Sequence, residues 1–165
     1  MARDRINLHL LRHAHAGDPD GWNGDDTARP LSKKGRRQSE QLGAHLVAIG
    51  FQTDTIVSSP KLRARETAEI VAAALGVDVR LDERLAGGVG VEDLEGLLNA
   101  AGNPDRPVLV GHDPDFSTLL VDLSGGGRLG LPKAGMACLQ LARPVEYGQA
   151  TLRWLLTPEV MPGSD

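Results

Sequence analysis

The sequence predicts an α/β protein, a three-layer αβα sandwich in which helices cover both faces of a mostly parallel sheet and the last two strands are antiparallel. Short apolar runs alternate with segments of helical periodicity along most of the chain. The runs at 136–141 and 151–156 have no helix between them, and the short loop 143–149 makes them antiparallel neighbours. With 165 residues, 41% of them hydrophobic, the chain can build one core. We therefore expect a single domain over 1–165, with a frayed tail at 159–165.

The first half of the chain supplies two strands and two helices. Residues 6–11 form a short apolar run that leads into a long polar loop, and the pattern at 32–49 predicts a helix. A second β-type run covers 54–58. Ser59 and Pro60 then predict an N-cap and a first-turn proline for the second helix.

The second half continues the alternation before the antiparallel pair. Residues 77–81 predict a third strand, 94–101 a third helix, and 108–110 a buried fourth strand. Asp113 and Pro114 then predict the cap of a fourth helix.

Polar motifs follow three of these strands directly. Arg12 and His13 come after the first strand, Arg63 lies in the helix after the second, and His112 follows the fourth. Because the carboxyl ends of parallel strands meet at one edge of the sheet, we expect these side chains to converge there. Arg63 would lie in the first turn of its helix, where a cation is unfavourable unless an anion is bound. The arrangement therefore predicts an anion site.

Phosphate is the anion that these side chains suit best. Planar guanidinium groups pair bidentately with phosphoryl oxygens. A neutral histidine can attack phosphorus through one ring nitrogen if the other donates to a backbone carbonyl and so fixes the tautomer. Among the residues at this edge, His13 fits that role best.

Four motifs occur in a fixed order, and together they resemble a known family. They are Leu11-Arg12-His13-Ala14, then Arg29-Pro30-Leu31-Ser32-Lys33-Lys34-Gly35, then Ser58-Ser59-Pro60 with Arg63-Ala64-Arg65-Glu66-Thr67-Ala68, then Gly111-His112-Asp113-Pro114. In order and spacing they resemble the histidine phosphatase superfamily, which has the phosphoglycerate mutase-like fold. The small size makes the chain most similar to the SixA-type phosphohistidine phosphatases. The resemblance runs from about residue 6 to 141.

The resemblance also implies roles for individual residues. His13 is the nucleophile that becomes phosphorylated, Arg12 and Arg63 bind the phosphoryl group, and His112 is the second histidine of the pocket. His15 is a further candidate for substrate binding, although a solvated loop histidine is an equal alternative. We expect no metal and no cofactor.

The general acid is the one part of the family pattern without a clear counterpart. Relatives that act on alkyl phosphates carry a Glu or Asp that protonates the leaving oxygen, and here Glu83, Asp18 and His15 are candidates only. Imidazole leaves with a pKa near 6.5 and needs a proton donor less than an alkoxide does. The gap therefore favours a substrate with an N–P bond or an activated ester. A protein phosphohistidine is the first candidate, with a histidine-containing phosphotransfer protein as a candidate partner.

Three alternatives stay open. The substrate of such a phosphatase could be a small phosphorylated metabolite. His13, His15, His112 and Asp113 could form a metal site in a metallohydrolase, although two arginines would be awkward beside the metal. The chain could also be a catalytically idle module that binds phosphate.

Composition and charge predict no further class of partner. The net charge is −4, and the basic residues form no long run, so we expect neither a nucleic-acid nor a membrane partner. The N-terminal apolar run is too short for a signal peptide or a membrane span. The single cysteine, Cys138, lies in an apolar run and is interpreted as a core residue. We expect a cytoplasmic protein.

Overall fold

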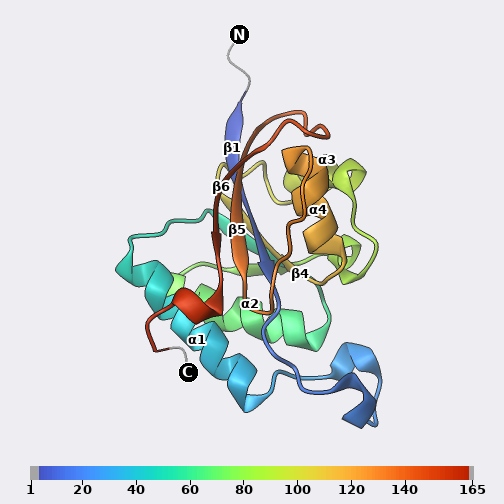
Figure 1. Ribbon diagram of the computed structural model, residues 1–165, viewed down its shortest axis with the longest axis vertical. Coiled ribbons are helices and arrows are strands. Elements are labelled where there is room, and N and C mark those ends of the chain that lie inside the picture. The colour runs from blue at the N-terminus through green and yellow to red at the C-terminus, as the bar shows by residue number, and fades with distance from the viewer. Residues whose placement is uncertain (1–3, 164–165) are drawn as a thin grey trace.

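The computed structural model describes residues 4–163 and shows a six-stranded sheet with the order β3-β2-β4-β1-β5-β6 (Figure 1). The strands are β1 (Arg5–Arg12), β2 (Thr55–Ser58), β3 (Val79–Leu81), β4 (Pro107–Gly111), β5 (Met136–Ala142) and β6 (Thr151–Leu156). The helices are α1 (Lys33–Ala48), α2 (Leu62–Leu75), α3 (Val91–Ala100) and α4 (Asp115–Ser124). Short 3-10 helices are η1 (Pro19–Gly21), η2 (Asp26–Ala28), η3 (Glu83–Ala86) and η4 (Pro158–Val160).

The pairing of the strands confirms the predicted mixed sheet. β1 is parallel to β4, and β2 is parallel to both β4 and β3. β5 is antiparallel to β1, and β6 is antiparallel to β5. Three parallel strands, β2, β4 and β1, therefore lie side by side at the centre of the fold, and all three end at the same edge.

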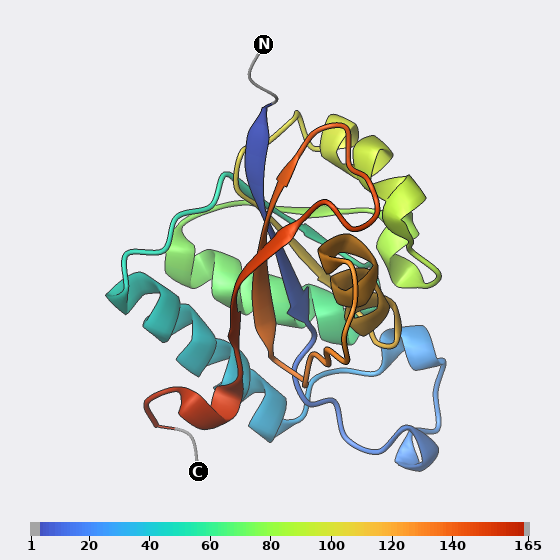
Figure 2. The ribbon, with the colours of Figure 1, turned by 45° about the horizontal axis from the view of Figure 1, so that its top comes forward.

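Helices cover both faces of the sheet, as predicted (Figures 1 and 2). On one face α1 and α2 pack against the strands through Leu42, Leu46 and Val71. On the other face α3 and α4 bury a second cluster that includes Leu94 and Phe116. The two apolar layers hold the central strands rigidly, so the loops that follow these strands start from fixed positions. Among residues 4–163, none of the helices is long and apolar enough to cross a membrane.

The predicted N-cap of the second helix is wrong. α2 begins at Leu62, and its N-cap is Lys61, which makes no side-chain capping bond. The hydroxyl of Ser59 instead accepts a hydrogen bond from the backbone N–H of Lys61 and lies 2.7 Å from a ring nitrogen of His112. Ser59 therefore belongs to the turn before α2, where its side chain contacts His112.

The structure describes the tail that we expect to be frayed as far as residue 163. η4 occupies part of it, and the Met161 side chain is buried in the cluster beneath α1 and α2. The Gln41 side chain donates a hydrogen bond to the carbonyl of Gly163. Burial of one large apolar side chain is enough to dock so short a segment. Residues 164–165 lie outside the described residues.

Candidate active site

The ends of β1, β2 and β4 bring three loops together. The N–H of His13, just after β1, donates to the Gly111 carbonyl at the end of β4 (3.0 Å). The N–H of Ser59, just after β2, donates to the Val110 carbonyl (2.9 Å). The ring centroids of His13 and His112 are 5.2 Å apart. The predicted meeting of two motifs from distant parts of the chain is therefore present in the structure.

His13 has the protonation state that a nucleophile needs. Its Nδ1 lies 2.7 Å from the carbonyl oxygen of Ala14, which can only accept, so Nδ1 carries the proton and Nε2 keeps its lone pair. Burial, together with the charges of Arg63 and Arg12, lowers the pKa of His13 to about 4. At neutral pH the ring is uncharged, and Nε2 can attack.

His112 is held by Ser59. Its Nε2 lies 2.7 Å from the Ser59 hydroxyl, whose oxygen already accepts from the N–H of Lys61 (3.2 Å). We assign the hydroxyl as the donor to Nε2, and this assignment makes Nδ1 of His112 the protonated nitrogen. Burial lowers the pKa of His112 to about 3, and the neighbouring His13 and Arg63 add to the shift.

Both predicted arginines lie at this site, and some of their N–H groups already donate hydrogen bonds to the protein. Arg63 is buried, and its two terminal nitrogens donate to the backbone oxygen (2.9 Å) and to Oδ2 (3.0 Å) of Asp26. Arg12 donates through Nη1 to the Leu131 carbonyl (3.0 Å), and the same nitrogen is 3.5 Å from Oδ2 of Asp113. These contacts orient the two guanidinium groups.

Three buried polar atoms in this region have no hydrogen-bond partner among residues 4–163: Nε of Arg12, Nε of Arg63 and Nδ1 of His112. An unsatisfied buried donor costs about 1–3 kcal/mol, more if it is charged. All three belong to residues that the sequence predicts as phosphoryl ligands. A bound anion with several acceptor oxygens would satisfy donors of this kind.

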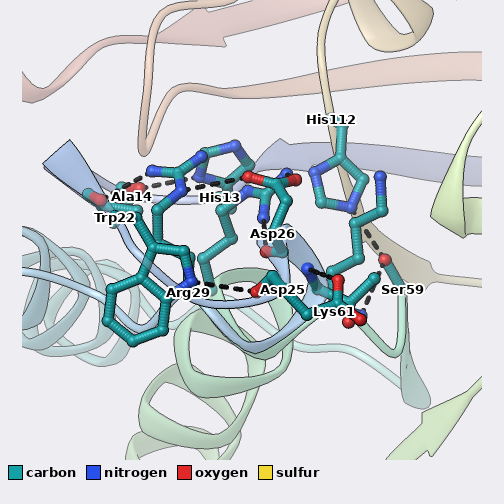
Figure 3. A network of polar contacts seen from close by, with 12 residues as sticks. His13, Ala14, Trp22, Asp25, Asp26, Arg29, Ser59, Lys61 and His112 are labelled. Carbon is teal, nitrogen blue, oxygen red and sulfur yellow. Dashed lines mark hydrogen bonds and ion pairs between the residues drawn. The ribbon is translucent and has the colours of Figure 1, made fainter. Parts of the chain in front are cut away.

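Asp26 is a site residue that the sequence did not predict (Figure 3). Its carboxylate contacts Arg63 (3.0 Å) and Nε of Arg29 (3.2 Å), while Nη1 of the buried Arg29 donates to the Ala16 carbonyl. Burial opposes ionisation of Asp26, but the hydrogen bonds and charges of the two arginines outweigh it, and its pKa is lowered. The loop 13–32 contains four aspartates, and no spacing distinguishes this one from the others.

The remaining candidates make hydrogen bonds elsewhere or are exposed. His15 turns its Nδ1 toward the Ser32 hydroxyl (2.7 Å). Asp18 is exposed and accepts a hydrogen bond from the N–H of Asp20 at the start of η1. Glu83 is exposed in η3. Neither carboxylate forms a hydrogen bond with His13 or His112 within the described part of the chain.

The alternative metal site is not assembled from the predicted residues. Across residues 4–163 there is no group of three or more His, Cys, Asp or Glu side chains that could hold a metal ion. Asp113, one of the proposed ligands, accepts hydrogen bonds from the N–H (3.0 Å) and hydroxyl (2.6 Å) of Ser117. Independence from metals stays a prediction for experiment.

Comparison with known proteins identifies the family. Residues 8–112 match the model of the histidine phosphatase superfamily (branch 1), and the chain belongs to this superfamily. It is 36% identical over 142 residues to an uncharacterized protein of Picosynechococcus, covering 82% of this chain and 85% of that protein. A Mycobacterium tuberculosis protein, also uncharacterized, is 32% identical over 157 residues, with 86% and 96% covered. An 8-oxo-(d)GTP phosphatase of Mycolicibacterium smegmatis is 34% identical over 110 residues, 64% of this chain but 34% of that protein.

Solved structures of phosphatases share the fold. The protein histidine phosphatase SixA complexed with tungstate superposes with a TM-score of 0.80 at 22% identity, covering 93% of this chain and 97% of that one. A SixA-type protein from Agrobacterium tumefaciens gives 0.76 at 25% identity, with 93% and 98% covered. The alpha-ribazole phosphatase of Shigella flexneri gives 0.71 at 18% identity, with 93% and 97% covered. The predicted phosphoglycerate mutase-like fold and the SixA-like resemblance are confirmed.

Proposed function

We propose that this protein is a metal-independent phosphatase that works through a phosphohistidine intermediate on His13. The observation that carries the proposal is the set of three unpartnered buried atoms beside a neutral, oriented histidine. Membership of the histidine phosphatase superfamily supports phosphatase activity and implies a phosphorylated substrate. The roles proposed for individual residues follow from the family resemblance, and the geometry of the site supports them.

The first chemical step is an in-line displacement at phosphorus. The phosphoryl group is held by Nε of Arg12, Nε of Arg63 and Nδ1 of His112. Nε2 of His13 forms the new N–P bond while the bond to the leaving group breaks, and the leaving group takes the electron pair. The two guanidinium groups offset the negative charge on the phosphoryl oxygens in the transition state.

The second step regenerates the enzyme. Water attacks the phosphorus of phosphorylated His13, the P–Nε2 bond breaks, and inorganic phosphate leaves with the oxygen of that water. The hydrogen bond from Nδ1 to the Ala14 carbonyl orients the ring through both steps and stabilises the positive charge that it carries while phosphorylated.

We further propose that the substrate has a leaving group of low pKa, with a protein phosphohistidine as the first candidate. Within residues 4–163, Asp26 is the carboxylate whose charge raises the pKa of His112, and this carboxylate is engaged by two arginines. Imidazole departs readily without a strong general acid, whereas an alkoxide does not. The SixA proteins superpose with higher TM-scores, 0.80 and 0.76, than the alpha-ribazole phosphatase with 0.71, which supports this choice.

A small phosphorylated metabolite is the second candidate substrate. It is favoured by the similarity to a phosphatase of 8-oxo-(d)GTP, a relative that is much longer than this chain. A cytoplasmic location for either substrate stays a prediction from the sequence.

One assay separates the candidates. The purified protein is incubated with a histidine-phosphorylated phosphotransfer domain and, in parallel, with a panel of aryl and alkyl phosphate monoesters and nucleotides. We expect the largest kcat/KM for the phosphohistidine domain. Preference for a nucleotide would support the metabolite, and binding of vanadate without any turnover would support an idle phosphate-binding module.

A further inference from the structure

A pocket of about 780 Å³ opens beside the site, and Arg12 lines both. The other lining residues come from the His15 loop, α1, the loop before β5, and η4; they are His15, Lys34, Arg37, Gln38, Gln41, Pro132, Lys133, Pro158 and Glu159. The first proposed phosphoryl ligand thus forms one wall of this pocket. A substrate whose phosphoryl group lies at His13 can extend into it.

The pocket is strongly cationic. Four of its lining side chains, those of Arg12, Lys34, Arg37 and Lys133, are positively charged, and the carboxylate of Glu159 opposes them. The Asp113 carboxylate, 3.5 Å from Nη1 of Arg12, offsets part of this charge, and the positive charges that remain repel one another more strongly near the protein surface than in bulk water. An anion in the pocket would relieve this repulsion.

Lys133 is fixed next to the catalytic strand. The N–H of Ala134 lies 3.1 Å from the carbonyls of both Arg12 and His13, and the N–H of Arg12 donates to the Gly135 carbonyl (3.1 Å). The two residues that follow Lys133 are therefore hydrogen-bonded to the end of β1, directly beside the proposed nucleophile. The position of Lys133 does not depend on a flexible segment.

The half-buried Lys133 ammonium has no carboxylate partner within residues 4–163. Burial lowers its pKa, and the charges of Arg12, Arg29 and Lys34 lower it further. A lysine in this position loses hydration without gaining a counterion. The positive charge of Lys133 is therefore unfavourable in the unliganded protein, and a bound anion would stabilise it.

Lys34 adds a second cation to the lining of the pocket. It lies in the first turn of α1, a helix with no acidic residue in that turn, so the positive end of the helix dipole is uncompensated. It forms no ion pair in the described chain. Lys34 and Lys133 also lower the pKa of His15, after the effect of burial, so both charges act on the same space.

We propose that this pocket is a second anion subsite, which binds a phosphate or carboxylate group carried by the substrate close to its scissile phosphoryl group. The proposal rests on the proposed function for the position of the phosphoryl group, and it deepens that function by naming a substrate class. The substrate carries two anionic groups, one transferred to His13 and one retained between Lys34 and Lys133.

The subsite is tested by the binding of three small anions, measured by isothermal titration calorimetry with a chelator present. Orthophosphate occupies the phosphoryl site alone, pyrophosphate adds a second phosphate, and phosphonoacetate adds a carboxylate. We expect at least one of the two longer anions to bind about tenfold more tightly than orthophosphate, as one added charge-assisted contact would allow. The better of the two identifies the second group.

The double variant Lys34→Met/Lys133→Met should lose most of that preference. The matched control is Lys33→Met, which removes the same charge from the adjacent position of α1, outside the pocket lining. It should keep the preference of the wild type. A double variant with the wild-type preference, or a wild type without any preference, would overturn the subsite.

Binding and turnover distinguish this failure from failure of the proposed function. Preferential binding of the longer anion without phosphorylation of His13 would overturn the proposed function and leave the subsite standing. Rapid turnover of an aryl phosphate with equal binding of all three anions would overturn the subsite alone.

Discussion

The hydroxyl of Ser59 lies 2.7 Å from Nε2 of His112, and both residues are buried. Ser59 follows β2 and His112 follows β4, so the contact joins two loops that are 53 residues apart. The serine oxygen also accepts from the N–H of Lys61, and we assign its proton to the bond with the histidine. Ser59 is thus a positioning residue that selects the tautomer of His112.

Replacing Ser59 with Ala should therefore reduce kcat/KM by about tenfold to a hundredfold, as loss of a group that orients a functional histidine does elsewhere. Ser59→Thr, which keeps the hydroxyl, should recover most of the activity. Ser58→Ala is the matched control, because the Ser58 hydroxyl donates to the Ser59 carbonyl and not to His112. Wild-type kinetics in Ser59→Ala would show that the tautomer of His112 has no bearing on catalysis.

Asp26 competes for the guanidinium that the phosphoryl group needs. Asp26→Asn keeps the shape of the side chain and removes the charge that offsets Arg63 and Arg29. Orthophosphate should then bind about threefold more tightly, the scale of one partly exposed ion pair, and aryl phosphate hydrolysis should persist. Calorimetry and steady-state kinetics measure the two quantities. Loss of alkyl phosphate hydrolysis alone in this variant would instead identify Asp26 as a general acid.

The free energy of unfolding should fall as the pH drops below the pKa of a histidine in the unfolded chain. The pKa of His13 is lowered to about 4 and that of His112 to about 3, with burial the main cause in each. The unfolded chain takes up these protons near pH 6.5, whereas the folded chain resists them. The stabilisation is therefore complete above pH 6.5 and is lost as the pH falls toward 4. Urea unfolding at pH 7.5 and pH 5 measures it.

The variant His112→Phe is informative for this pH dependence, because it removes one of the titrating groups. Its free energy of unfolding should decline less between the two pH values than that of the wild type. The buried His9, whose pKa burial lowers to about 4, still titrates in the variant, so part of the decline remains. An equal decline in both proteins would contradict the buried, neutral state of His112.

The leaving group should control the rate. Without a strong general acid, aryl phosphates should react faster than alkyl phosphates, and each tenfold difference corresponds to about 1.4 kcal/mol of barrier. Alanine at Glu83 or Asp18 should leave aryl phosphate hydrolysis unchanged, since both side chains are exposed and form no bond with the histidine pair. A series of phenols of graded pKa measures the dependence. A flat dependence that becomes steep in one variant would reveal a hidden acid.

The elements of the central sheet were predictable because each strand is a short apolar run with a sharp polar end. Arg12, His13 and His112 stand at such ends, so the parallel topology alone brings them to one edge. Asp26 was not predictable, because its contact with Arg63 depends on the path of a long loop. Ser59 was mistaken for a helix cap, because a serine before proline suits a cap and a side-chain ligand equally.

The most direct test of the account is to trap the phosphorylated enzyme. The protein is mixed with ³²P-labelled substrate, quenched in alkali, and digested for peptide mapping, with His13→Ala as the control. The account predicts an acid-labile, base-stable label on the peptide that contains His13, and neither label nor turnover in the variant. Label on another residue, or turnover that survives in His13→Ala, would contradict the central claim that His13 is the nucleophile.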